Sequence, residues 1–140
     1  MKTVLFRLWQ WTWGFPQTLL GAVLYLIYRK CPHELYHGAV VTHWPMGGSL
    51  GVGMFLFLGK HTDPTVRPRV LVHEYGHAVQ SLILGPLFLP IMGIPSFLWC
   101  NLKSCKKARK KKGISYYSFY PESTANRLGE AVTKTPCNLK

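Results

Sequence analysis

Residues 70–84 read VLVHEYGHAVQSLIL, and this apolar stretch decides where the centre of the fold lies. It is long enough for about four helical turns and stops at Gly85-Pro86, a pair that ends helices. Its apolar residues lie almost all round the expected helix, which is typical of a helix buried in protein or in lipid. The polar residues that interrupt it are His73, Glu74, His77 and Gln80. Burying such groups is costly unless something satisfies them, and a metal ion with its bound water would do so.

The pattern His-Glu-x-x-His occurs twice in the chain, as HELYH at 33–37 and as HEYGH at 73–77. Two histidines four residues apart hold one metal ion only where a continuous helix keeps both rings on one face. HELYH runs into a glycine and the largely β-branched residues 39–42, so a helix there would have about one turn. The sequence therefore favours HEYGH, on a helix over 69–84. Gly76 within this helix indicates that a neighbour packs closely against it.

Catalytic zinc takes three protein ligands and leaves a fourth position for water, so the two histidines need a partner. The acidic residues outside HEYGH are Glu34, Asp63, Glu122 and Glu130. Glu122 opens a predicted helix over 121–129, and Asn126 follows four residues later on the same face. We therefore predict that Glu122 is the third zinc ligand and that Asn126 hydrogen-bonds a ligand histidine. Two alternatives remain: Glu122 as a charge that stabilises the helix N-terminus, and His37 as a competing ligand.

The remaining roles in the predicted site follow from the chemistry of bound Zn²⁺. His73 and His77 would be ligands, and Glu74 would be the general base that takes a proton from zinc-activated water. The developing oxyanion needs a donor besides the metal. The aromatic run YYSFY offers three candidates, Tyr116, Tyr117 and Tyr120. The sequence does not choose among them.

HEYGH followed by ESTAN at 122–126 resembles the gluzincin metallopeptidases, whose pattern is HExxH and a later Glu-x-x-x-Asp, as in membrane-embedded prenyl-protein and heat-shock endopeptidases. PESTANRLG is similar to their E-x-x-A-D-R-L segment, with Asn126 in place of the Asp. The resemblance covers about residues 38–130 and extends to small bacterial membrane proteins presumed to be metallopeptidases. It implies a minimal zincin-like fold and hydrolysis of a peptide or protein substrate near the membrane. Site-2-type intramembrane proteases are also similar, but this chain lacks their later Asp-Gly pair.

The N-terminal region predicts a transmembrane helix over 8–28, because these 21 residues carry no charge and would span a hydrocarbon core. Trp9, Trp11 and Trp13 at one end and Arg29-Lys30 at the other match an aromatic belt and a basic flank. We therefore expect a protein of the bacterial inner membrane with its basic flank on the cytoplasmic side. A buried hairpin or an amphipathic surface helix is the alternative.

The rest of the chain predicts a single α+β domain over 1–140, associated with the membrane. Residues 36–59 indicate a β-hairpin around the turn signal PMGG, or else a glycine-rich segment inserted in the membrane. Residues 86–102 are uncharged, and their prolines favour a broken or re-entrant helix. We expect the four cysteines to be free thiols, since they show no metal-binding spacing.

Residues 103–113, KSCKKARKKKG, hold seven basic residues and no acidic one, within a chain of net charge +12. The pattern predicts a basic loop that is either solvated or, on the cytoplasmic side, lies on anionic lipid headgroups through Lys103–Lys112. Nucleic-acid binding has less support, because no aromatic residue interleaves these charges.

A second class of function is a non-catalytic membrane protein, such as an immunity or partner-binding factor, with a structural or degenerate zinc site. The small size of the chain favours it, since little protein is left to build a substrate cleft. Glu74 distinguishes the two classes, because a structural site needs metal ligands but has no use for a general base.

Overall fold

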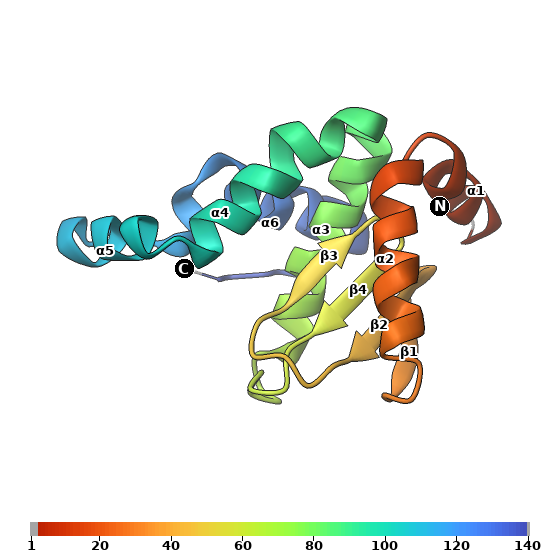
Figure 1. The fold of residues 1–140 in the computed structure, drawn as a ribbon, viewed down its shortest axis with the longest axis horizontal. Helices are drawn as coiled ribbons and strands as arrows, with labels where there is room; N and C mark the ends of the chain where they lie inside the picture. The colour runs from red at the N-terminus through yellow and green to blue at the C-terminus, as the bar shows by residue number, and fades with distance from the viewer. Residues whose placement is uncertain (1–2, 140) are drawn as a thin grey trace.

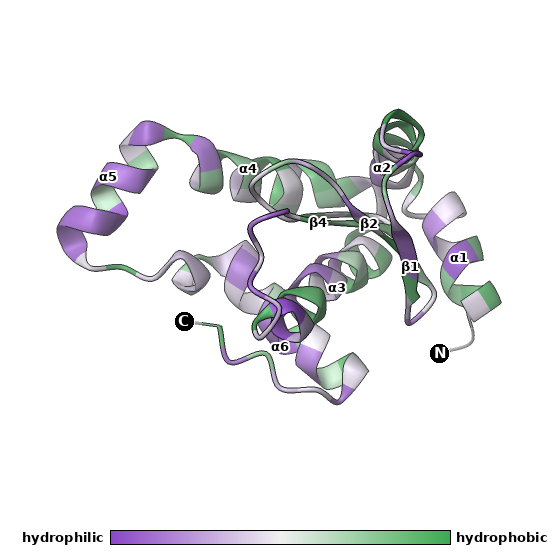
Figure 2. Cartoon of the chain, turned by 90° about the horizontal axis from the view of Figure 1, so that it is seen from below, coloured by the Kyte–Doolittle hydropathy of each residue, from purple (hydrophilic) through white to green (hydrophobic). Residues whose placement is uncertain are grey.

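Strand β4 (Phe55–Leu58) is an inner strand of the sheet in the computed structural model, which describes residues 3–139. All four of its side chains are buried, because helix α2 (Phe15–Ile27) covers one face of the sheet and helix α3 (Arg67–Leu84) covers the other (Figure 1). Figure 2 shows the sheet between these two helices. An uninterrupted apolar strand such as FLFL is expected where both faces of a sheet are covered.

The sheet has the strand order β1-β2-β4-β3, in which β1 is His33–Tyr36, β2 is Ala39–His43 and β3 is Leu50–Val52. β1 pairs with β2 and β3 with β4 in antiparallel fashion, whereas β2 and β4 are parallel. The chain thus forms two hairpins where the sequence predicted a single one over 36–59. The reason is that the PMGG segment does not turn β2 back on itself. It carries the chain to β3, which lies beyond β4.

The predicted transmembrane helix over 8–28 is wrong, and with it the membrane-associated fold class and the inner-membrane localisation. The segment is divided between α1 (Thr3–Thr12) and α2, which has 13 residues and begins with Pro16 in its first turn. Among residues 3–139, no helix combines the length and the apolar character that a membrane crossing requires. The fold is α+β, with six α-helices and a small mixed sheet in the described residues.

Polar side chains explain why this uncharged segment lies on the protein. Gln10, Gln17 and Thr18 are fully buried. Gln10 Nε2 donates to the carbonyl of Ala78 at 2.9 Å, and Gln17 Nε2 donates to Ser81 Oγ at 2.6 Å. These bonds fasten α1 and α2 to α3. The segment thus packs on α3 through its buried polar side chains, while many of its apolar side chains, among them Leu26 and Ile27, are exposed.

The second half of the chain consists of helices that run over and beyond α3. A 3₁₀ turn (Gly85–Leu87), a wider π-type turn (Leu89–Gly93) and α4 (Ile94–Asn101) form a broken helix. Helix α5 (Lys103–Lys112) follows where the sequence predicted a loop, and Figure 1 shows it projecting from the body. Lysine, alanine and arginine are good helix formers, and Gly113 ends α5 in the left-handed conformation.

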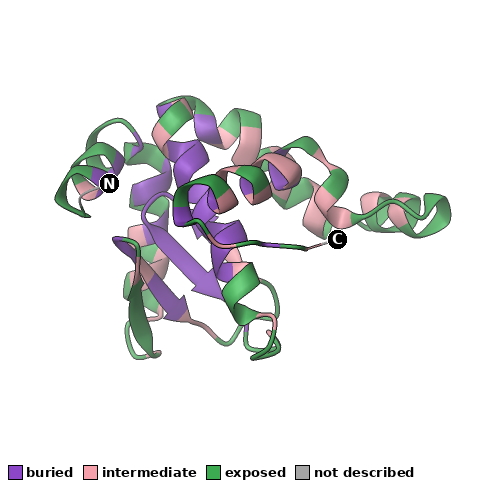
Figure 3. Ribbon diagram, turned by 180° about the vertical axis from the view of Figure 1, so that it is seen from behind, coloured by how far each residue is buried: buried purple, intermediate pink, exposed green. Residues whose placement is uncertain are grey.

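Helix α6 (Tyr120–Thr133) returns the chain to α3. Figure 3 shows that burial is concentrated in the sheet, in α3 and in the facing side of α6, whereas α5 is exposed or half-buried. All four cysteines are free thiols, as predicted.

Candidate metal centre

Two glycines let α3 and α6 cross at close range. A Cβ on Gly76 would lie 1.8 Å from the carbonyl oxygen of Ala125, and a Cβ on Gly129 would lie 2.1 Å from that of Val72. Neither site has room for any larger residue. The close packing predicted at Gly76 is therefore present, and it brings the first turn of α6 against the HEYGH segment of α3.

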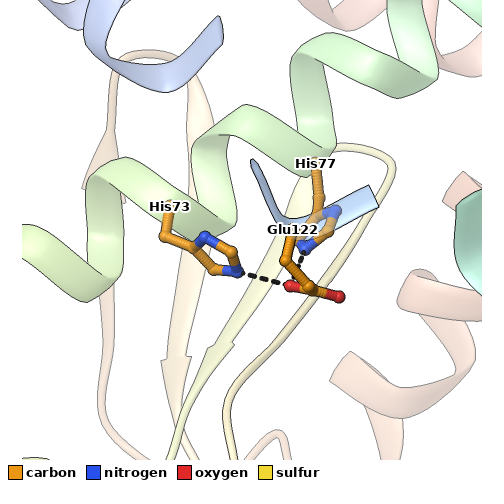
Figure 4. A group of neighbouring side chains, drawn as sticks. All are labelled: His73, His77 and Glu122. Carbon is orange, nitrogen blue, oxygen red and sulfur yellow. Dashed lines mark ion pairs between the residues drawn. The ribbon is translucent and has the colours of Figure 1, made fainter. Parts of the chain in front are cut away.

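This crossing brings together His73, His77 and Glu122, the three residues predicted as metal ligands (Figure 4). Glu122 Oε2 lies 2.9 Å from His73 Nε2 and 3.4 Å from His77 Nε2, and all three side chains are buried. Tetrahedral zinc with bonds of about 2.0–2.2 Å separates its ligand atoms by about 3.3–3.6 Å. The three ligand atoms all lie within 4.8 Å of one another, close enough to hold one metal ion.

Hydrogen bonds to the outer ring nitrogens fix the tautomers of both histidines. His73 Nδ1 lies 2.5 Å from Asn126 Oδ1, and His77 Nδ1 lies 2.8 Å from Gln80 Oε1. Gln80 Nε2 in turn donates to the carbonyl of Pro121 at 2.8 Å, which directs the amide oxygen of Gln80 at His77. Because amide oxygens only accept, both histidines carry their proton on Nδ1 and turn an Nε2 lone pair toward Glu122.

Three lone pairs therefore converge on one point with no hydrogen between them, an arrangement that a cation satisfies. Glu122 Oε2 has no hydrogen-bond donor in this arrangement, although it is buried. Without a metal ion the site attracts protons instead. Burial alone would lower the pKa of His77, but the hydrogen bond and charge of Glu122 outweigh it and raise that pKa to about 9. Burial opposes the same pairing at Glu122, whose pKa nevertheless falls below its usual range because the adjacent His73 and His77 favour its charged form.

Glu74 lies beside this cluster on the inner face of α3 and is buried. Burial raises the pKa of its carboxyl group, against the opposing effect of the two histidines. Its position depends on β3. A Cβ on Gly51 would lie 2.6 Å from the carbonyl oxygen of Glu74 and 3.2 Å from its Oε2. The absence of a side chain at Gly51 therefore lets β3 approach the main chain and the carboxyl group of Glu74.

A cavity of about 500 Å³ opens from the cluster and is bordered by all four residues, His73, Glu74, His77 and Glu122. Its other walls are mainly apolar and come from α2, from β3 and the loop before it, and from α4. Glu122 is also bonded from α4, since Ser96 Oγ donates to its Oε1. The four residues therefore face a space large enough for part of a peptide.

Of the three candidate tyrosines, Tyr116 borders this cavity. Tyr117 instead packs its ring edge-on against His73, with 5.1 Å between ring centroids. Tyr120 donates its hydroxyl to the carbonyl of Ile91 at 2.6 Å and is about half exposed. Burial, with a smaller effect of the Glu122 charge, raises the pKa of Tyr116 above its usual range, so its hydroxyl keeps the proton that it would donate.

The other copy of the motif lies away from the cluster. HELYH forms β1 and the turn after it, and its Glu34 pairs with His43 at 3.2 Å. His37, the alternative ligand, occupies that turn with a positive φ of 47° and packs against Tyr36 and Tyr75. It is not part of the metal cluster.

Sequence reasoning did not predict the roles of Gln80 and Ser96. Gln80 stands three residues after His77, so helical spacing could have placed it beside that ring. Ser96 offers no comparable signal, because its contact with Glu122 depends on how the broken helix before α4 folds back.

Comparison of the chain with protein-family models, with curated proteins and with solved structures finds no match. The assignment of the site therefore rests on the distances between its residues, and the choice of metal rests on the kinds of ligand atom that they offer.

Proposed function

We propose that the chain is a zinc-dependent peptide hydrolase of the gluzincin type. The observation that carries this proposal is that a buried cluster of two histidine nitrogens and a carboxylate oxygen faces a cavity together with a fourth residue, Glu74, suited to be a base. Two imidazole nitrogens and one carboxylate oxygen are the donors of many catalytic zinc sites. When bound, such an ion lowers the pKa of a water molecule and polarises a carbonyl group.

The residues of the site would then have three roles: binding the ion, fixing the histidine rings and moving a proton. His73, His77 and Glu122 would hold the ion, with Asn126 and Gln80 fixing the two rings. Glu74 would take the proton of the attacking water and pass it to the leaving amine. Burial raises the pKa of its carboxyl group, and a carboxylate with a raised pKa accepts a proton more readily.

Two further features support a peptide as the substrate. Strand β3 is the last strand of the sheet and lines the cavity, so an extended peptide could add to its free edge. Tyr116 would then donate its hydroxyl to the developing oxyanion. The mainly apolar walls favour a peptide with apolar side chains next to the bond that is cut.

The non-catalytic alternative has less support. Structural zinc sites usually have four protein ligands, whereas this cluster has three and is open to a cavity. A structural role also gives no use to the buried Glu74, which borders the same cavity.

The test compares the matched glutamates of the two motifs. Wild type, Glu74→Gln and Glu34→Gln would be purified, their zinc measured by elemental analysis and their activity measured on a mixture of quenched fluorescent peptides. We expect Glu74→Gln to keep its zinc and to lose about 10²- to 10⁴-fold in cleavage rate, and Glu34→Gln to keep both. Wild type that takes up no zinc, or Glu74→Gln that cleaves at the wild-type rate, would refute the proposal.

A further inference from the structure

One of the seven basic residues of α5 has an environment unlike that of the other six. The lysines of this helix are exposed, whereas Arg109 is half-buried. Its guanidinium lies 4.6 Å from the ring centroid of Trp99 and 5.3 Å from that of Tyr116. It also donates to the carbonyl of Trp99. Arg109 thus contacts the body of the protein through two aromatic rings and a carbonyl, which suits a planar cation better than a lysine.

Trp99 completes the connection between these segments. Its Nε1 donates to the main-chain carbonyl of Tyr116 at 2.9 Å, and its ring stacks on Phe119 with 4.8 Å between centroids. Tyr116 is therefore held from two directions, by Trp99 at its main chain and by Arg109 at its ring. Together Trp99, Arg109 and Tyr116, which we call the aromatic clamp, join α4, α5 and the short turn Tyr116–Ser118.

Tyr116 needs such a support because the chain around it provides little. Residues 113–115, which precede it, are exposed, and a Cβ on Gly113 would meet no atom within 4 Å. Yet the ring of Tyr116 borders the cavity at the metal centre. A hydroxyl that stabilises a transition state must be held at one point, because a displacement of about 1 Å can remove most of its effect.

We propose that Arg109 is a positioning residue that holds Tyr116 in the cavity for catalysis. The proposal rests on the proposed hydrolysis and extends it to a residue of the basic helix that touches neither the metal ligands nor the cavity. The proposal gives this role to Arg109 alone and not to the lysines of α5.

The experiment uses the full chain saturated with zinc and four variants: Arg109→Met, the control Lys110→Met, Tyr116→Phe, and the double variant Arg109→Met/Tyr116→Phe. We expect Arg109→Met to lower kcat about tenfold, with KM within about twofold and the zinc content unchanged. Lys110→Met should behave as wild type. If Arg109 acts through Tyr116, the double variant should be no slower than Tyr116→Phe alone. Additive losses in the double variant, or an unchanged kcat in Arg109→Met, would overturn the proposal.

Two readouts do not depend on turnover. The affinity of a phosphinic peptide, which mimics the tetrahedral intermediate, should fall in Arg109→Met by the same factor as kcat. Hydrogen–deuterium exchange over residues 113–119 should become faster in Arg109→Met and stay unchanged in Lys110→Met. If exchange becomes faster in Arg109→Met but the wild type cuts no peptide, the proposed hydrolase is refuted and the aromatic clamp stands. Cleavage by wild type with unchanged exchange in Arg109→Met would refute the clamp and leave the hydrolase.

Discussion

The two His-Glu-x-x-His segments share three letters in the same order, yet only one of them forms a site. Four residues of an α-helix rise about 6 Å, whereas four residues of an extended strand reach about 13 Å. In α3 the rings of His73 and His77 therefore lie 4.9 Å apart, centroid to centroid. In β1, His33 bonds to Thr42 Oγ1 at 2.9 Å, and His37 lies in the turn after this strand. Only the helical copy of the motif brings its two histidine rings close enough to hold one ion.

The two segments also differ in what surrounds them. HEYGH is buried between the sheet and α6, so neighbours reach both outer ring nitrogens of its histidines. HELYH is on the outermost strand and largely exposed. Three residues after His77 stands Gln80, and three residues after His37 stands Val40, which cannot hydrogen-bond a ring. A metal site thus needs the hydrogen bonds to the outer ring nitrogens of its histidines as much as it needs the ligands themselves.

The largest effect should come from exchanging the last histidine of each segment for alanine. His77→Ala should weaken zinc binding by about a thousandfold or more, because one of three ligands is lost. His37→Ala should leave zinc binding unchanged. Titration against a competing chelator measures both affinities. Loss of zinc binding in His37→Ala but not in His77→Ala would show that the metal site lies at HELYH and not at HEYGH.

Gly76 and its counterpart Tyr36 occupy the same position of the motif, and only the glycine lies at a helix crossing. Gly76→Ala should destabilise the protein by about 3 kcal/mol or more, because its Cβ would overlap the carbonyl of Ala125. The expected fall in Tm is about 10 °C. Gly48→Ala is the control, since its Cβ meets no atom within 4 Å. Equal Tm values for the two variants would contradict the close crossing.

The free energy of unfolding should depend on pH, because His77 of HEYGH lies beside the carboxylate of Glu122. In the metal-free fold the pKa of His77 is about 9, above its unfolded value of about 6.5. Its contribution is therefore fully present below about pH 6.5 and lost as the pH rises through 9. Chelator-treated protein should lose up to about 3 kcal/mol of unfolding free energy across this range, measured by urea denaturation. The metal-free His77→Gln variant should show a flatter profile, and an equal slope would contradict this origin.

The smallest effect should come from the residue that supports the second histidine. Gln80→Leu leaves His77 Nδ1 without its acceptor and should weaken zinc binding about 10- to 100-fold. Val40→Leu, at the same offset from HELYH, should have no effect on zinc. Isothermal titration with zinc in a competing buffer measures both. Unchanged affinity in Gln80→Leu would show that the tautomer is set by other contacts.

Local periodicity was enough to place the parts of the site that lie on helices. The pair His73 and His77 and the pair Glu122 and Asn126 follow from residues four apart, and the close packing at Gly76 follows from a glycine inside a helix. The third ligand could also be found by counting, because few acidic residues remain. These features depend only on neighbours in the same helix.

The parts that could not be predicted depend on distant partners. The parallel pairing of β2 with β4 needs a crossing connection that no local turn signal reveals. The uncharged segment 8–28 predicts a membrane helix, and the contacts that instead hold it on the protein cannot be seen locally, because the partners of Gln10 and Gln17 lie 64 to 68 residues away in the chain. Helix α5 forms where the run of charges predicts a loop, because its lysine, alanine and arginine residues favour a helix.

The division of the ligands between α3 and α6 has a consequence for synthesis on the ribosome. Two histidines are made first, and the carboxylate that completes the cluster follows only after residues 78–121. A growing chain therefore cannot hold the ion with full affinity until α6 has been made and has docked through Gly76 and Gly129. An ion bound by the full cluster would therefore report that α6 has folded against α3.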